Sequence, residues 1–260
     1  MHENFVTSAM ISYVERTACL IAASLSLYYY FLHYHGTFSK MPIDLHHVPG
    51  SAPCRAVRLA AKLVGVDLNL IYTDLMKGEH MTPEYLKANP QHTVPTINDN
   101  GFHLHESRAI ITYFANKYGK DDSLYPKEPE KRAIVDELLY FDIGTLYQRF
   151  GDYWYPVMFA GASFDEEKKK KLDEALGFLD KFLEGKTFAA GDSITVADAS
   201  LAASVSTIEI AGIDFSAHKN VVAWFAASKA ALPGYEEENH KGAVAFRELF
   251  DNITGGKYKQ

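Results

Sequence analysis

The chain has 260 residues, and its 47% of hydrophobic and 13% of aromatic residues are sufficient for the packed core of one or two globular domains. The formal net charge is -7, and the basic run at 168–171 lies among acidic residues as a solvated helix face, so nucleic acid is not an expected partner. Two cysteines in unrelated segments argue against a disulfide framework and fit a reducing compartment, and eleven histidines without ligand spacing argue against a metal site.

Residues 1–40 precede the first predicted element and contain a segment, Thr17 to Ser39, without any charged side chain. A membrane-spanning helix needs about 20 mainly apolar residues, but serines and histidines dilute this segment. A secretory signal begins with a basic region, whereas Glu3 and Glu15 stand here against Arg16. We interpret residues 1–40 as a poorly ordered or loosely docked extension, with a signal peptide or membrane anchor as the alternative, and expect the folded protein to start at Met41.

Alternating strand and helix patterns over residues 41–120 predict one α/β domain. In chain order we expect a strand at 43–47, a helix at 52–64 that ends at Gly65, a strand at about 68–74, a helical turn near 82–84, a hairpin with strands from 94 and at 102–105, and a helix from 106 to 118. The opening strand, helix and strand form a βαβ unit, which predicts parallel pairing of the first two strands.

A charged segment with two prolines, residues 121–129, is expected to link this domain to an all-helical domain, residues 130–260. Helical periodicity predicts helices at 130–160, 165–184, 195–211, 218–231 and 236–251. Thr195 and Asp198 have the spacing of a capping box, in which the hydroxyl and the carboxylate satisfy free amides at a helix start. We interpret this pair as structural.

The motif Ser51-Ala52-Pro53-Cys54-Arg55 opens the first helix, and Val94-Pro95 precedes the third strand. This pair outlines a thioredoxin-like domain in which serine replaces the attacking cysteine of a redox enzyme. Ser51 and Cys54 cannot cycle through a disulfide, so Cys54 is predicted to be a buried helix thiol and a thiol oxidoreductase is disfavoured. The missing nucleophile suggests that the thiol arrives with a ligand.

Five motifs in order resemble cytosolic glutathione transferases of the insect delta class, over roughly residues 42–254. They are Ser51 to Arg55, Gly78 to His80, Asn89 to Pro95, Glu106 to Arg108 and Gly191 to Asp198. The resemblance implies the glutathione transferase fold, with a thioredoxin-like domain followed by an all-helical domain. It also implies a cytoplasmic homodimer that detoxifies hydrophobic electrophiles, with glutathione as co-substrate and no other cofactor.

Ser51 is the predicted thiolate stabiliser, because its hydroxyl lies just before a helix N-terminus. Lowering a thiol pKa of about 8.5 by about two units takes about 2.7 kcal/mol. A hydrogen bond to a charged group contributes about 1.5 to 3 kcal/mol, and a helix N-terminus about 0.3 to 1 kcal/mol. Ser51 can therefore be the main stabiliser without acting as a base, and its alternative role is a plain helix cap.

The resemblance implies that different residues bind the two ends of glutathione. The γ-glutamyl end is expected at Glu106 and Ser107, with Arg108 alongside, and the glycyl carboxylate at His80 and His92. The loop between them is expected to hold the cysteinyl unit through the backbone of Val94, next to Thr93 and a cis peptide at Pro95. The alternatives are an ordinary capped helix for Ser107, a buried salt bridge for Arg108, and surface loop positions for the two histidines.

An aromatic series, Tyr147, Phe150, Tyr155 and Phe159, recurs near helical spacing in the second domain and is the expected electrophile site, with plain core as the alternative. Pro156 is expected to bend this helix. Peroxide reduction and dehydrohalogenation are plausible side activities of the same thiolate. The alternative function is a non-catalytic carrier of glutathione or hydrophobic ligands.

Overall fold

The structure is a computed structural model that describes residues 42–258. The predictions for residues 1–40 and for a start at Met41 therefore lie outside the described residues. Between residues 42 and 258, no helix combines the length and apolar character needed to cross a bilayer. The same part of the chain holds no group of three His, Cys, Asp or Glu side chains arranged to bind a metal ion.

A four-stranded sheet with the order β2-β1-β3-β4 forms the first layer. Its strands are β1 (Ile43–His47), β2 (Leu68–Tyr72), β3 (Thr96–Asp99) and β4 (Phe102–His105). β1 is parallel to β2 and antiparallel to β3, so the predicted parallel pair and the hairpin are confirmed. β2 ends at Tyr72, short of Asp74, because the Asp74 carboxylate accepts the backbone N–H groups of Met76 and Lys77 in a turn.

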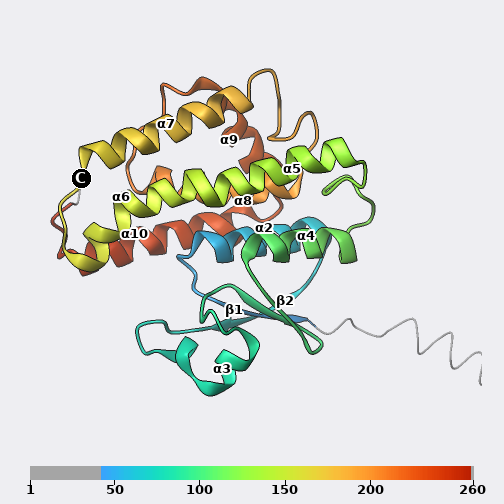
Figure 1. Cartoon of the computed structure of the whole chain (residues 1–260), viewed down its shortest axis with the longest axis horizontal. Coiled ribbons are helices and arrows are strands. Elements are labelled where there is room, and N and C mark those ends of the chain that lie inside the picture. The colour runs from blue at the N-terminus through green and yellow to red at the C-terminus, as the bar shows by residue number, and fades with distance from the viewer. Residues whose placement is uncertain (1–41, 259–260) are drawn as a thin grey trace, which may run out of the picture. The chain divides into compact units, whose positions relative to one another are not determined.

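Helices cover both faces of this sheet, with α2 (Ala52–Val64) and α4 (Ser107–Tyr118) on one face and α3 (Pro83–Ala88) on the other (Figure 1). The predicted bounds of α2 are confirmed, because local caps fix both of its ends. Ser51 is its N-cap, and Gly65 ends it with a left-handed φ of 69°. A short 3-10 turn, η1 (Glu79–Met81), precedes α3.

The remaining helices form an all-helical region against α2 and α4 (Figure 1). They are α5 (Pro129–Phe141), α6 (Tyr147–Ala160), α7 (Glu166–Phe182), α8 (Val196–Ile210), α9 (Lys219–Ala231) and α10 (Lys241–Ile253). Two π-helical segments, η2 (Asp142–Leu146) and η3 (Glu236–His240), were not expected. A π turn adds one residue to a continuous helix, which leaves the apolar periodicity around it almost unchanged. The predicted fold class is confirmed.

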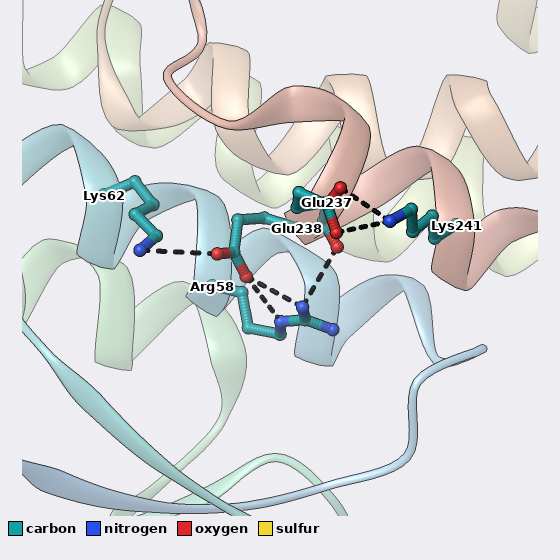
Figure 2. Close-up of polar contacts among 5 residues, drawn as sticks. All are labelled: Arg58, Lys62, Glu237, Glu238 and Lys241. Carbon is teal, nitrogen blue, oxygen red and sulfur yellow. Dashed lines mark hydrogen bonds and ion pairs between the residues drawn. The ribbon is translucent and has the colours of Figure 1, made fainter.

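The central helix α8 is buried on almost every side, and small residues let α2 approach it closely. Ala52 and Ala56 of α2 pack against Ala203 of α8, and all three are at most 2% exposed. Arg58 and Lys62 of α2 also reach the Glu238 carboxylate of η3, at 2.8 and 3.5 Å (Figure 2). Packing and ion pairing therefore fix α2 against the helical region.

The predicted pair at the start of α8 is structural, as expected. The buried Asp198 carboxylate accepts the backbone N–H of Thr195 at 2.8 Å and its hydroxyl at 3.1 Å. It also accepts the N–H of Ala189 at 2.7 Å and the indole Nε1 of Trp224 at 2.8 Å. Four donors from three segments of the chain thus converge on one carboxylate, so its acceptor positions are occupied.

Candidate active site

A cavity of about 380 Å³ lies beside the N-terminus of α2, where loops of the sheet meet α6 and α10. Eight of the predicted site residues line it: Ser51, His80, His92, Thr93, Val94, Tyr147, Tyr155 and Phe159. A larger cavity, of about 810 Å³, lies between α6, α7 and the segment after α8 and contains none of the predicted residues. The smaller cavity is therefore the candidate site.

Ser51 faces this cavity and caps α2 at the same time. Its backbone is extended, and its hydroxyl oxygen accepts the backbone N–H of Cys54 at 3.4 Å. A hydroxyl that accepts one hydrogen bond still has its own proton to donate. The capping role and a donor role toward the cavity are therefore compatible.

Cys54 is a fully buried free thiol. Burial raises its pKa to about 11, against a smaller opposing effect of the nearby Ser51 hydroxyl. The prediction of a buried helix thiol is confirmed. A thiol that is buried and has a raised pKa is a poor nucleophile, because the thiolate is the reactive form.

Two histidines that line the cavity lie close together, with ring centroids 6.0 Å apart. Nδ1 of His80 is buried and has no hydrogen-bond partner within residues 42–258. His92 is exposed and has a left-handed φ of 48°, which is unusual for a residue with a Cβ. Both rings line the cavity, and an imidazole N–H is a hydrogen-bond donor.

Two side chains that the sequence analysis did not predict to be part of the site hold the loop that carries Thr93 and Val94. Asn89 donates its amide to the Thr93 carbonyl at 3.0 Å, and the Tyr85 hydroxyl donates to the same carbonyl at 2.6 Å. The Val94–Pro95 peptide is cis. Pro95 itself is buried and does not line the cavity.

Glu106, Ser107 and Arg108 lie at the start of α4 but are not part of the cavity wall. Glu106 has a φ of 69°, a strained backbone for a non-glycine residue. Arg108 donates to the Ser107 hydroxyl at 2.9 Å and pairs with the buried Asp142 carboxylate at 2.5 Å. The structure thus shows the buried salt bridge that was the alternative for Arg108, whose guanidinium carbon lies 5.9 Å from the Tyr147 ring centroid.

The tyrosines of α6 form the helical wall of the cavity. The hydroxyls of Tyr147 and Tyr155 lie 2.6 Å apart, and burial raises the pKa of both groups. Phe159 is 61% exposed at the rim, whereas Phe150 is fully buried and stacks on Trp154 at 5.7 Å. Phe150 therefore belongs to the core, which was the alternative for this series.

Helix geometry explains why Phe150 departs from the series. At about 100° per residue, Tyr155 lies about 80° to one side of Tyr147 and Phe150 about 60° to the other. Met158 lies about 20° from Tyr147 on the same side as Tyr155, and it does line the cavity. A strict count along the helix would have replaced Phe150 by Met158.

Other lining residues could not be singled out from local patterns. Phe246 and Leu249 of α10 and Leu75 of the β2–α3 connection reach the cavity only through the fold. Asp142 does not line the cavity, but it too is recognised only in the folded structure: it is fully buried and lies 34 residues from its partner Arg108. No local sequence signal marks these four positions.

Comparison with known proteins identifies the family of the chain. The family models described as glutathione S-transferase N-terminal and C-terminal domains match residues 45–124 and 149–229. A solved delta-class glutathione transferase of Nilaparvata lugens is 62% identical over 82% of this chain and 100% of its own, with a TM-score of 0.80. A Bombyx mori glutathione transferase is 52% identical over 80% and 98%, with a TM-score of 0.79.

More distant relatives share the same fold. An epsilon-class glutathione S-transferase of Musca domestica is 37% identical over 83% of this chain and 98% of its own, with a TM-score of 0.76. Identity thus falls from the delta-class to the epsilon-class structure while the fold is retained. The chain belongs to the glutathione S-transferase family, and the resemblance to its insect delta class is confirmed.

Proposed function

We propose that the protein conjugates the thiol of glutathione to hydrophobic electrophiles in the cavity beside Ser51. One observation carries the proposal: the residues expected for the thiolate, for the glycyl carboxylate and for the electrophile line the same cavity, although they come from segments far apart in the sequence. A tripeptide with two carboxylates and a thiol needs such separate groups at its two ends and its centre.

Ser51 stabilises the thiolate by donating its hydroxyl proton to sulfur. The N-terminus of α2 adds to this effect, because no acidic residue lies in the first turn to cancel its positive end. The two contributions, about 1.5 to 3 and about 0.3 to 1 kcal/mol, are sufficient for a fall of about two units in the thiol pKa.

The two ends of glutathione are held by different parts of the first domain. His80 and His92 bind the glycyl carboxylate, and the backbone of Val94, next to Thr93 and Pro95, pairs with the cysteinyl unit. At the γ-glutamyl end the α4 N-terminus, with Glu106 and Ser107, binds the charged groups. Arg108 acts there as a positioning residue, because its guanidinium fixes the Ser107 hydroxyl.

The electrophile binds against Tyr147, Tyr155 and Phe159, with Phe150 supporting the wall from the core. The thiolate sulfur forms a bond to the electrophilic carbon, and the leaving group departs with the electron pair of the broken bond, as chloride does from an aryl chloride. No cofactor besides the co-substrate takes part. Peroxide reduction and dehydrohalogenation use the same thiolate.

A homodimer in the cytoplasm remains the expected state of the enzyme. Exposed apolar side chains on the hairpin and on α5 support an interface, since Phe102 is 47% and Tyr140 75% exposed. Light scattering on the purified protein would distinguish a dimer from a monomer.

Glutathione binding and conjugation, measured side by side, test the proposal against a carrier. We expect Ser51→Ala to bind glutathione in calorimetry but to conjugate it to chlorodinitrobenzene about 10- to 100-fold more slowly, since it loses one hydrogen bond to a charged group. Ser193→Ala, an exposed serine, is the matched control and should retain full activity. Unchanged activity of Ser51→Ala would favour a carrier or a different catalytic group.

A further inference from the structure

The guanidinium of Arg55 is buried in the first turn of α2 without a carboxylate partner within residues 42–258. Arg55 is 0% exposed. Its Nη1 donates to the Ser206 hydroxyl at 2.8 Å and to Oδ1 of Asn239 at 2.5 Å, and its Nη2 donates to the Thr207 hydroxyl at 2.5 Å. All three acceptors are neutral, although buried charges in proteins are ordinarily paired. The positive charge of Arg55 is therefore uncompensated.

A second arginine on the same helix shows the contrast. Arg58, one turn further along α2, pairs with the carboxylate of Glu238 at 2.8 Å and donates to the Glu237 carbonyl (Figure 2). The segment η3 thus places an acid against Arg58 and, at the next position, an amide against Arg55. Glu238 is therefore a counter-ion for Arg58, whereas its neighbour Asn239 is not a counter-ion for Arg55.

The side chain of Arg55 has little freedom to move away. A Cβ on Gly242 would lie 2.6 Å from Cδ of Arg55 and 2.3 Å from the Pro49 carbonyl oxygen, so glycine is required where α10 passes this arginine. The backbone N–H of Arg55 donates to the Ser51 carbonyl at 3.0 Å. The buried charge and the proposed thiolate stabiliser therefore share one rigid helical turn.

The titratable groups around Arg55 carry no charge that could cancel its own near pH 7. Burial raises the pKa of Cys54 to about 11 and that of Tyr235 to about 12. Burial also raises the pKa of Tyr147 and Tyr155, and the positive charge of Arg55 opposes the rise in both. These two tyrosines line the cavity with Ser51, so the field of Arg55 reaches the cavity wall.

We propose that Arg55 is a positioning residue whose uncompensated charge stabilises the glutathione thiolate in the Ser51 cavity. The inference rests on the proposed function and adds a third source of stabilisation to the Ser51 hydroxyl and the N-terminus of α2. A unit charge about 10 Å away, at an effective dielectric constant of about 20, shifts a pKa by about one unit. A purely structural Arg55 would only tie α2 to α8 and η3.

Asn239→Asp separates the two roles, because it supplies a counter-ion while Arg55 stays in place. The readout is the pKa of the bound glutathione thiol, from ultraviolet thiolate absorbance against pH, together with the pH profile of kcat/KM. We expect a rise of about half to one pH unit relative to the wild type. Asn252→Asp, on the exposed side of α10, is the matched control and should leave the thiol pKa unchanged.

Arg55→Lys and Arg55→Met give a second route that does not depend on Asn239. The lysine variant keeps the charge and should keep the thiol pKa near the wild-type value, whereas the methionine variant should raise it; denaturant unfolding identifies the variants that are folded. A folded Asn239→Asp or Arg55→Met protein with the wild-type thiol pKa would overturn the proposal. If the wild type itself shows no depressed thiol pKa, the proposed function fails first.

Discussion

Helices α2 and α8 both have a hydroxyl residue as their N-cap, Ser51 and Thr195, but the two N-termini differ in the anion that they face. At α8 the Asp198 carboxylate supplies the negative charge that a helix N-terminus favours, and four donors saturate it. At α2 the first turn has no acid, and Ser51 opens on a cavity. A helix start that supplies its own anion is structural, whereas one that lacks an anion can receive it from a ligand.

The largest expected effect on conjugation activity comes from placing a carboxylate at the N-terminus of α2. Ser51→Asp keeps a good N-cap, so the free energy of unfolding should change by less than about 0.5 kcal/mol. The added carboxylate should repel the thiolate, and conjugation should fall by more than about 100-fold. Steady-state kinetics with denaturant unfolding measures both, with Ser193→Asp as the exposed control. An active Ser51→Asp enzyme would break the comparison.

The converse change removes the internal anion from α8. Asp198→Asn turns one acceptor oxygen into a donor that faces N–H groups, and we expect a loss of about 2 to 4 kcal/mol in the free energy of unfolding. Asp192→Asn, at an exposed position of the loop before α8, should change stability by less than about 0.5 kcal/mol. Equal stabilities of the two variants in urea would contradict a structural role for Asp198.

Asp99 at the hairpin turn is a second carboxylate that, like Asp198, receives its hydrogen bonds from the chain itself, although it does not lie at a helix N-terminus. Burial alone would raise the pKa of its carboxyl, but hydrogen bonds from Lys117 at 2.8 Å, from Tyr113 at 2.6 Å and from Tyr118 hold that pKa below its usual range. The chain supplies every donor, so Asp99 should act on stability alone.

Because the folded-state pKa of Asp99 lies below the unfolded value of about 3.9, its contribution is complete well above that value. The contribution is lost as the pH falls through about 4 toward the folded-state pKa. We expect the unfolding free energy of the wild type to decline more steeply below about pH 4 than that of Asp99→Asn, by about 1 to 2 kcal/mol. Parallel declines would show that Asp99 is not the group that titrates.

The elements that the sequence predicted well are those with local signals at their ends. Ser51 and Gly65 fix both ends of α2. In the hairpin only the facing strand ends, Asp99 and Phe102, are fixed locally by the tight turn between them, and the strand expected from residue 94 begins at Thr96. The π segments η2 and η3 escaped prediction, because a single wide turn leaves no trace in apolar spacing. Long-range burial decides where such turns form.

The site divides in the same way. Ser51, His80 and His92 stand in short motifs, and the fold brings them to one cavity. Phe150 shows the limit of an aromatic pattern, because its position around the helix axis places it in the core and not at the cavity. Asp142 and Asn239 contact residues that are far away in the sequence. Only the packed structure shows that Asp142 forms a salt bridge with Arg108 and that Asn239 accepts a hydrogen bond from Arg55.

The pKa of the glutathione thiol bound to the wild type and to Ser51→Ala tests the central claim most directly. Thiolate absorbance in the ultraviolet, followed against pH, reports the ionised fraction in each complex. The account predicts a wild-type pKa about two units below the free value of about 8.5, and a return toward that value in Ser51→Ala. Equal pKa values in the two complexes, or a wild-type value equal to that of free glutathione, would contradict it.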